Sequence, residues 1–157
     1  MKIKLFVVGK SAFDFVKEGE ELYEKRLVHY LPFEKLVLQD IKNPKNLSQD
    51  ELKKKEGELI LSKISNQDFL VLMDENGTYF SSVNFSEWMN QKLNEGIRSL
   101  VFVIGGAYGF SKEVYDRSNF LISLSKMTFS HQLVRVIFLE QLYRAQTILK
   151  GEPYHHE

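Results

Sequence analysis

Residues 100–129 read LVFVIGGAYGFSKEVYDRSNFLISLSKMTF, and this stretch decides how the rest of the sequence is interpreted. Residues 100–104 form a continuous apolar run, which predicts a buried strand, and the glycine-rich segment 105–109 follows directly. A second predicted strand, 120–124, leads into the polar segment 125–129 in the same way. In α/β proteins, loops that follow the carboxyl ends of neighbouring strands form the ligand site. The two loops therefore predict a cradle for a nucleotide-like ligand.

The remaining sequence alternates predicted strands and helices. Ser48 and Glu51 form a capping box that opens one helix, and Gly96 ends another. The segment 74–77, DENG, is a strong turn signal that ends a strand. Strands are predicted at 2–8, 33–38, 69–73, 100–104 and 120–124, and helices at 13–29, 48–64, 86–95, 112–117 and 132–149. This alternation predicts an α/β fold, a single domain over residues 1–157 with a mostly parallel sheet and helices on both faces.

The composition is that of an ordinary globular domain. The 157 residues include 21 basic and 21 acidic residues, and this balance argues mildly against a dedicated nucleic-acid binder. There is no cysteine, which excludes thiolate metal sites, thiol redox catalysis and disulfides, and no metal site is predicted. No apolar run is long enough to cross a membrane, and the first residues do not resemble a signal peptide. We therefore expect a cytoplasmic protein without membrane association.

Each of the two strand-end loops also has an interpretation without a ligand. The glycines at 105–109 let a ligand approach the backbone closely, or they form a plain tight turn. Their spacing, G-G-x-x-G, differs from the dinucleotide fingerprint, and Ser125 stands where that fingerprint has an acid, which disfavours a nicotinamide cofactor. The segment 125–129 offers backbone groups for an adenine and an apolar side chain to cover it. Alternatively, it leads into the last helix with Ser130 as the N-cap.

The last helix and the tail carry further polar candidates. Helix 132–149 is apolar around more than half of its circumference, which predicts deep burial or contact with a partner subunit. Arg144 follows Glu140 at i,i+4 spacing and is either functional or a surface ion-pair partner, whereas Arg135 stands among apolar residues on the opposite side. In the segment 153–156, PYHH, an aromatic ring beside histidine can stack on a base and move a proton. Alternatively, the segment is a disordered end.

The order of motifs in the last third of the sequence is specific. It contains IGG at 104–106, LSKMTF at 124–129, H-x-L-x-R at 131–135, LYRA at 142–145 and PYH at 153–155. With these motifs the sequence closely resembles the ribosomal RNA large subunit methyltransferase H family. The resemblance continues more weakly through the first half, including KIKLFVVGK at 2–10 and KEGE at 55–58, and so covers the whole chain.

The resemblance implies a small SPOUT-like methyltransferase whose carboxyl-terminal chain forms a trefoil knot and which works as a homodimer. It also implies methylation of N3 of a pseudouridine in the large-subunit (23S) ribosomal RNA, on assembled ribosomes, with S-adenosyl-L-methionine as the cofactor. Relatives often have leucine at the position of Met73, and many differ at His156. The residues implied in cofactor binding are Met73, Gly105, Leu124, Ser125, Lys126, Met127, Thr128 and Phe129.

Within this framework we hypothesise that Arg135 and Arg144 hold a phosphate or a base edge of the RNA, while Tyr154 and His155 arrange the target. The exact nucleotide, the general base, the need for prior pseudouridylation and the choice between the 50S and 70S particle stay open. Two other classes also remain, a non-catalytic ribosome-associated protein of the same fold and a nicotinamide oxidoreductase. The intact glycine turn, 124–129 loop and tail favour an active methyltransferase over the first class, and the missing acid disfavours the second.

Overall fold

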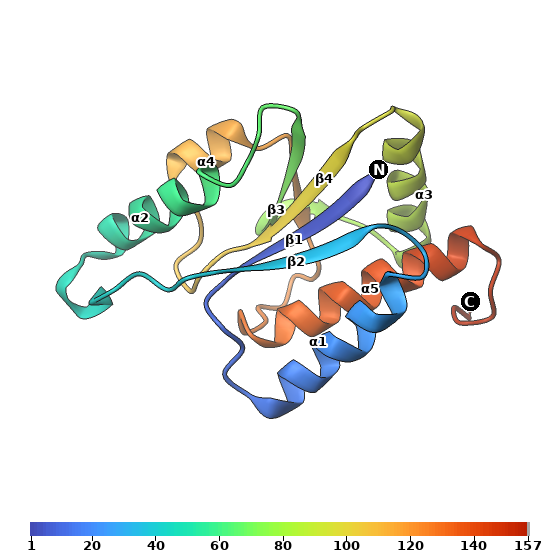
Figure 1. Ribbon diagram of the computed structural model, residues 1–157, viewed down its shortest axis with the longest axis horizontal. Coiled ribbons are helices and arrows are strands. Elements are labelled where there is room, and N and C mark those ends of the chain that lie inside the picture. Colours follow the sequence, from blue (N-terminus) through green and yellow to red (C-terminus); the bar gives the residue numbers. More distant parts are fainter. Residues whose placement is uncertain (157) are drawn as a thin grey trace.

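The computed structural model describes residues 1–156 and shows one sheet with the strand order β2-β1-β4-β3-β5 (Figure 1). Every pairing between neighbouring strands is parallel, as predicted. The strands are β1 (Lys2–Val8), β2 (Phe33–Leu38), β3 (Asp68–Tyr79), β4 (Ser99–Ile104) and β5 (Phe120–Ser123). The carboxyl ends of all of these strands therefore lie at the same edge of the sheet, where the sequence predicts the ligand site.

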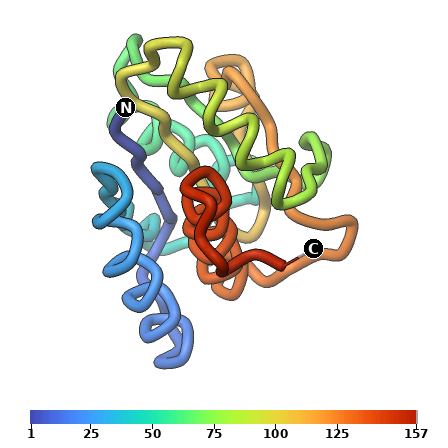
Figure 2. Tube along the Cα trace, turned by 90° about the vertical axis from the view of Figure 1, so that its right-hand side faces the viewer, coloured from blue at the N-terminus to red at the C-terminus, as the bar shows by residue number. Residues whose placement is uncertain are grey.

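Helices cover both faces of the sheet, which confirms the predicted fold class. On one face α5 packs between α1 and α3 (Figure 2). On the other face α2 and α4 lie together (Figure 1). The helices are α1 (Asp14–Leu27), α2 (Gln49–Leu61), α3 (Ser82–Asn94), α4 (Lys112–Arg117) and α5 (Leu133–Leu149), and a short 3-10 turn covers Pro44–Asn46.

The apolar run at 100–104 is explained by the position of β4 inside the sheet. Leu100, Phe102 and Ile104 belong to the core on the side of α3 and α5. Val101 and Val103 belong to the core on the side of α2 and α4. Because helices cover both faces, successive side chains of this strand are buried in alternate directions, and none of them needs to be polar.

The predicted end of β3 at residue 73 is wrong, because the strand resumes after a bulge. Met73 and Thr78 both pair with Ile122 of β5, so residues 74–77 loop out of the ladder. A Cβ on Gly77 would lie 2.5 Å from the backbone of Ile122, which explains the glycine. The turn signal DENG is therefore a bulge within a strand rather than a turn at its end.

Serine caps set the start of two helices on opposite faces. The predicted capping box of α2 is confirmed: Ser48 Oγ accepts the N–H of Glu51 at 3.1 Å, and the Glu51 carboxylate accepts the N–H of Ser48 at 2.8 Å. α3 begins at Ser82, earlier than the predicted residue 86, because the side chain of Ser81 accepts the N–H of Asn84 at 3.1 Å.

Candidate active site

The carboxyl ends of β3, β4 and β5 and the start of α5 enclose a cavity of about 810 Å³. This volume lies within the roughly 300–1,000 Å³ that is typical of ligand pockets. The cavity is lined by all of the predicted cofactor residues, Met73, Gly105, Leu124, Ser125, Lys126, Met127, Thr128 and Phe129. The fold thus brings together, around one space, residues that are separated by up to 56 positions in the sequence, from Met73 to Phe129.

The turn after β4 is shaped by its glycines and by Glu56 of α2. Gly109 has a φ of +82°, a conformation that side chains rarely adopt. A Cβ on Gly106 would lie 2.8 Å from both carboxylate oxygens of Glu56. Burial, and to a smaller extent the nearby Asp40, raise the pKa of Glu56. The KEGE segment therefore places a carboxyl group directly against the glycine turn.

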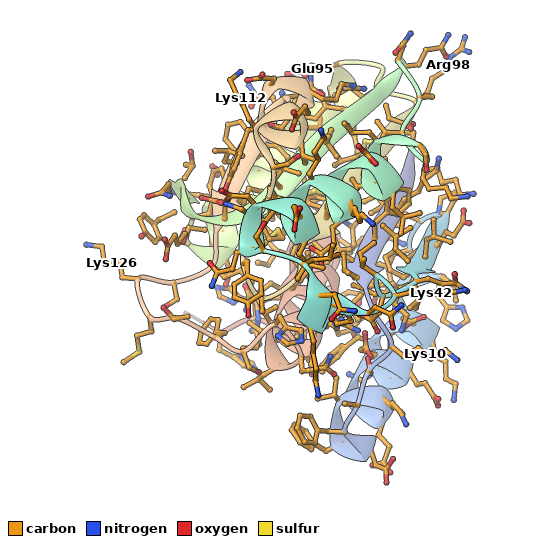
Figure 3. The ribbon with its side chains drawn as sticks, turned by 90° about the vertical axis from the view of Figure 1, so that its left-hand side faces the viewer. Lys10, Lys42, Glu95, Arg98, Lys112 and Lys126 are labelled. Carbon is orange, nitrogen blue, oxygen red and sulfur yellow. The ribbon has the colours of Figure 1, made fainter. Side chains whose placement is uncertain are left out.

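The loop after β5 is shaped by serine hydroxyls instead. Ser123 Oγ donates to the carbonyl oxygen of Ser125 at 3.1 Å, and Ser125 Oγ accepts the N–H of Met127 at 2.9 Å. The Met127 side chain is 77% exposed. Lys126 projects away from the body of the protein (Figure 3). The serines fix the course of the loop, so that its remaining backbone groups stand at the cavity in a defined arrangement.

Polar side chains also fix the start of α5 beside the cavity. Ser130 Oγ accepts the N–H of Leu133 at 3.1 Å and so supports the helix start, although the N-cap of α5 is Gln132 rather than the predicted Ser130. Gln132 precedes the helix and accepts the N–H of Ala12 at 2.8 Å, while its amide group donates to the carbonyl oxygen of Lys10 at 3.4 Å. The loop after β1 is thereby tied to the helix start.

The bulge in β3 contributes a held carboxylate to the cavity wall. The phenol of Tyr115 donates to one oxygen of Asp74, and the N–H of Asn76 donates to the other at 2.9 Å. Burial and the hydrogen bond to Asp74 raise the pKa of Tyr115 to about 12. Sequence reasoning missed both residues, because the segment 74–77 has the composition of a plain turn.

Arg135 is fully buried beneath the end of β1, with an exposed fraction of 0%. Its guanidinium donates to the carbonyl oxygens of Val8 at 2.6 Å and Gly9 at 2.9 Å. It also donates to Ser11 Oγ at 3.2 Å and to the carbonyl oxygen of His131 at 3.2 Å. Burial lowers the pKa of this group, although an arginine stays charged in proteins. The predicted RNA contact of Arg135 is not possible in this structure, and its hydrogen bonds indicate a structural role.

Arg144 belongs to a different environment, which we call the tail cluster: Glu140, Arg144, Tyr154 and His155. Arg144 Nη2 forms an ion pair with Glu140 Oε1 at 2.5 Å, and Arg144 Nη1 lies 3.3 Å from His155 Nδ1. Tyr154 Oη donates to the same Glu140 oxygen at 3.1 Å, and the guanidinium lies 4.7 Å from the centroid of its ring. The structure therefore brings three of the predicted residues together and adds Glu140, which contacts both Arg144 and Tyr154.

The tail packs against the body of the protein, contrary to the interpretation as a disordered end. The Tyr154 ring meets the Tyr143 ring at a centroid distance of 4.8 Å and an angle of 71°. Tyr30 Oη donates to Glu152 Oε2 at 2.5 Å. Burial raises the pKa of Tyr154, so its phenol remains a proton donor to its neighbours. His156 is exposed at the end of this segment.

The cavity and the tail cluster do not meet within one chain. Among the residues that the structure describes, no member of the tail cluster lines the cavity. α5 connects the two regions, since His131 and Val134 line the cavity near the start of the helix. Arg144 lies about 15 Å further along the helix axis, at about 1.5 Å per residue. The predicted site therefore consists of two parts.

Exposed apolar side chains gather on α1 and at the start of α5, which pack side by side. Phe13 and Phe15 are 54% and 63% exposed, and their rings stack at a centroid distance of 5.7 Å. Leu22 and Leu133 are also exposed. Large exposed apolar groups on adjoining helices, among them the stacked Phe13 and Phe15, are typical of a surface that contacts another molecule.

Residues 1–156 contain no group of three or more histidine, cysteine, aspartate or glutamate side chains that could hold a metal ion. In the same part of the chain, no helix combines the length and the apolar character needed to cross a membrane.

A family profile described as a predicted SPOUT methyltransferase matches residues 1–155. The chain belongs to this family and is a methyltransferase that takes its methyl group from a donor molecule. Within the family it belongs with the proteins named ribosomal RNA large subunit methyltransferase H. The one from Christiangramia forsetii is 56% identical over 99% of both chains. The one from Parabacteroides distasonis is 54% identical over the full length of both.

Among solved structures, a probable methylase family protein from Haemophilus influenzae Rd KW20 matches with a TM-score of 0.53. The match covers 99% of this chain and 70% of that one, at 11% sequence identity. At this identity the likeness concerns the fold alone. The trefoil knot that the family implies for the carboxyl-terminal part stays a prediction.

Proposed function

We propose that the protein uses S-adenosyl-L-methionine to methylate N3 of a pseudouridine in large-subunit ribosomal RNA. The observation that carries this proposal is the convergence of Met73, Gly105 and the loop 124–129 on one cavity. The name of the relatives, ribosomal RNA large subunit methyltransferase H, supports the choice of RNA. Ribosomes are cytoplasmic, so the same substrate supports the expectation that the enzyme works in the cytoplasm.

The residues around the cavity fit S-adenosylmethionine, which joins an adenosine to a charged amino-acid tail. Ile104, Leu124 and Phe129 provide apolar surface for the ring. The backbone of the glycine turn and of the loop 124–129 provides hydrogen-bonding groups near that surface. Such a ligand requires apolar surface for its ring and fixed polar groups for its ribose and charged tail.

When bound, the cofactor supplies an electrophilic methyl group on a sulfonium centre. The protein must hold the acceptor nitrogen roughly 3–3.5 Å from that methyl group and in line with it. It must also favour loss of the proton from N3, because negative charge develops on the base. The loops around the cavity supply the positioning. The tail cluster supplies the charged and hydrogen-bonding groups that stabilise the negative charge on the base.

Within the tail cluster, Arg144 is the cation suited to stabilise the negative charge on the base. Its Nη1 lies 3.3 Å from His155 Nδ1. When the guanidinium donates this hydrogen bond, neutral His155 carries its own proton on Nε2 and can donate it to the RNA. Tyr154 and Glu140 hold the guanidinium in place through the ring contact and the ion pair.

A homodimer would join the two parts of the site. The tail cluster of one chain does not reach its own cavity, whereas a second chain could bring its tail cluster to it. The exposed apolar residues on α1 and at the start of α5 support such an association, because burial of Phe13, Phe15 and Leu133 would be favourable. Each active site would then take its cofactor loops from one subunit and Arg144 from the other.

Phosphate contacts must come from cations other than Arg135. Lys10, Lys42 and Lys126 are exposed at the carboxyl edge of the sheet, and none of them forms an ion pair within residues 1–156 (Figure 3). Three such lysines per chain and a net charge of zero give weak affinity for free RNA. We therefore propose that an assembled ribosomal particle provides the remaining contact surface.

The decisive experiment is incubation of the protein with methyl-labelled S-adenosylmethionine and ribosomes that lack the modification, followed by mass-spectrometric mapping. Label on one pseudouridine of the large-subunit RNA is the expected result. An absence of label despite confirmed cofactor binding would reject this RNA as the substrate. An absence of cofactor binding would favour the non-catalytic class. Labelling of an isolated hairpin as fast as of ribosomes would contradict the proposed need for the particle.

The two-subunit site is tested by mixing two inactive variants. Arg144→Ala damages only the tail cluster. Gly105→Val damages only the cavity side, because its Cβ would lie 2.9 Å from the ring of buried Phe110. After exchange of subunits, a mixed dimer carries one site in which both parts are intact. Recovery of activity on mixing is expected, and a mixture as inactive as its components would contradict a shared site. A mass of one chain at micromolar concentration would contradict the dimer itself.

A further inference from the structure

Asp74 occupies a central place in the wall of the cavity. The last paired positions of β3 and β4 are Leu72 and Val103, so Asp74 and Gly105 follow them at the same level of the neighbouring strands. On the other side, the bulge that contains Asp74 loops out opposite Ile122 of β5. The carboxylate therefore stands between the glycine turn and the loop after β5, and all of these residues line the cavity.

The carboxylate is held at both oxygens. Tyr115 Oη donates to Oδ2, and the N–H of Asn76 donates to Oδ1 at 2.9 Å. Tyr115 is itself fixed, because its ring meets that of buried Phe110 edge to face at 5.8 Å and 85°. Phe110 in turn packs against Gly105, where a Cβ would lie 2.9 Å from its ring. A chain of contacts thus sets the position of Asp74 relative to the glycine turn.

The other charged groups around the cavity are not held in this way. Glu75 is exposed, and no ion pair of its side chain is found within residues 1–156. Lys126 projects outward from the loop after β5 (Figure 3). Solvent screens charges on such exposed side chains far more than a charge held against the protein surface. Among the charged side chains that line the cavity, Asp74 is therefore the one held at both oxygens by hydrogen bonds, and its charge is negative.

We propose that Asp74, positioned by Tyr115, determines the specificity of the cavity for a positively charged sulfonium donor over the neutral thioether product. The inference rests on the proposed function, since it takes the ligand of the cavity to be S-adenosylmethionine. The donor and S-adenosylhomocysteine share the adenosine and the amino-acid tail and differ in one methyl group and one positive charge. A fixed carboxylate attracts that extra charge and so separates two ligands that the rest of the cavity binds almost equally.

The roles of the two residues are distinct. Asp74 carries the negative charge. Tyr115 holds the Asp74 carboxylate in its orientation through the hydrogen bond that it donates. The pKa of Tyr115, raised to about 12, keeps the phenol protonated through the physiological range, so it remains a donor to the carboxylate. An enzyme with this arrangement releases its product more readily than its donor, which favours repeated turnover when the product accumulates.

The test is the ratio of the dissociation constants of S-adenosylhomocysteine and S-adenosylmethionine, measured by calorimetry on the full chain without RNA. In Asp74→Asn this ratio should fall by about tenfold, since that factor corresponds to about 1.4 kcal/mol of lost attraction to the charge. In Tyr115→Phe the ring packing is kept and only the donated hydrogen bond is lost, so we expect a fall of about threefold. Any general damage to the pocket weakens both ligands and leaves the ratio unchanged.

Two variants complete the design. Asp116→Asn removes an exposed carboxylate of α4 outside the cavity wall, where Asp116 pairs with Lys112 at 2.5 Å, and should leave the ratio unchanged. Glu75→Gln removes the exposed acid next to Asp74 and should change the ratio less than Asp74→Asn does. An unchanged ratio in Asp74→Asn, or an equal fall in Glu75→Gln, would overturn the assignment. Failure of the unmodified chain to bind either ligand would instead overturn the proposed function and, with it, this inference.

Discussion

Arg135 and Arg144 lie on the same helix, nine positions apart, and the structure gives them opposite surroundings. At about 100° per residue, nine positions turn the side chain to the opposite side of the helix. Arg135 points under the end of β1 and is completely buried. Arg144 points to the tail and stays partly exposed. Arg135 stabilises the fold at the carboxyl edge of the sheet, whereas Arg144 is accessible to a substrate.

The sequence suggests a different assignment. Arg144 has a glutamate at i,i+4, which is typical of a plain surface pair, whereas Arg135 stands alone among apolar residues and looks functional. In the structure Arg135 binds backbone carbonyl oxygens. Every residue has such a group, so the sequence gives no sign of this contact. The surface pair of Arg144 is real but is extended by Tyr154 and His155. Of two arginines on one helix, the one without an obvious charged partner in the sequence can therefore be the one that stabilises the fold.

The largest effect that this comparison predicts is on stability. Arg135→Met keeps the volume but leaves the carbonyl oxygens of Val8 and Gly9 without their donors, and Glu20 loses a nearby positive charge. Unsatisfied buried groups of this kind cost together about 3–5 kcal/mol in the free energy of unfolding. Denaturant unfolding monitored by circular dichroism measures this loss.

Arg135→Lys is the matched control, because it keeps the charge but not the planar group that reaches several acceptors at once. We expect about half of the loss seen in Arg135→Met. Equal stability of Arg135→Met and the unmodified chain would show that the buried guanidinium is not structural. Loss of RNA binding at unchanged stability would restore the functional interpretation of Arg135.

The second prediction concerns Arg144, where the effect should fall on activity. Arg144→Ala removes the cation that we expect near the target base, and kcat/KM for methyl transfer should fall about 100-fold, the range for loss of one charge-stabilising donor. The side chain is partly exposed, so the free energy of unfolding should change by about 1 kcal/mol or less. Single-turnover labelling of ribosomes and parallel denaturant curves separate the two effects.

Cofactor affinity is the internal control for that variant. Because Arg144 does not line the cavity, Arg144→Ala should bind S-adenosylmethionine almost as well as the unmodified chain. A large loss of cofactor affinity would place Arg144 at the cavity and contradict the division into two parts. A loss of stability as large as that of Arg135→Met would remove the difference between the two arginines.

Local sequence signals were sufficient for the sheet, its two helical layers and the edge that carries the cavity. The apolar run at 100–104 and the glycines after it fix a buried strand and its end without any knowledge of distant residues. The grouping of Met73, Gly105 and the loop 124–129 follows, because parallel strands end at one edge. Cofactor binding by these residues stays a prediction.

Contacts between distant parts of the sequence could not be predicted. Arg135 binds the carbonyl oxygens of Val8 and Gly9, which lie 127 and 126 positions away. Tyr115 reaches Asp74 across 41 positions, and the bulge that presents Asp74 looks like a turn in the sequence. Such contacts depend on how the elements pack, and neither periodicity nor composition encodes the packing of one particular pair.

The smallest effect that we predict concerns the hydroxyl group of Tyr154 in the tail cluster. Tyr154→Phe keeps the ring beneath the guanidinium but removes the hydroxyl that donates to Glu140 at 3.1 Å. The ion pair between Glu140 and Arg144 then loses one of its supports, and we expect kcat/KM to fall about fivefold, at the low end for a lost hydrogen bond to a charged group. Tyr154→Ala should cost far more, because the ring contact is also lost. Equal rates for Tyr154→Phe and Tyr154→Ala would assign the whole effect to the hydroxyl, and Tyr154 would then act by hydrogen bonding rather than as a support for Arg144.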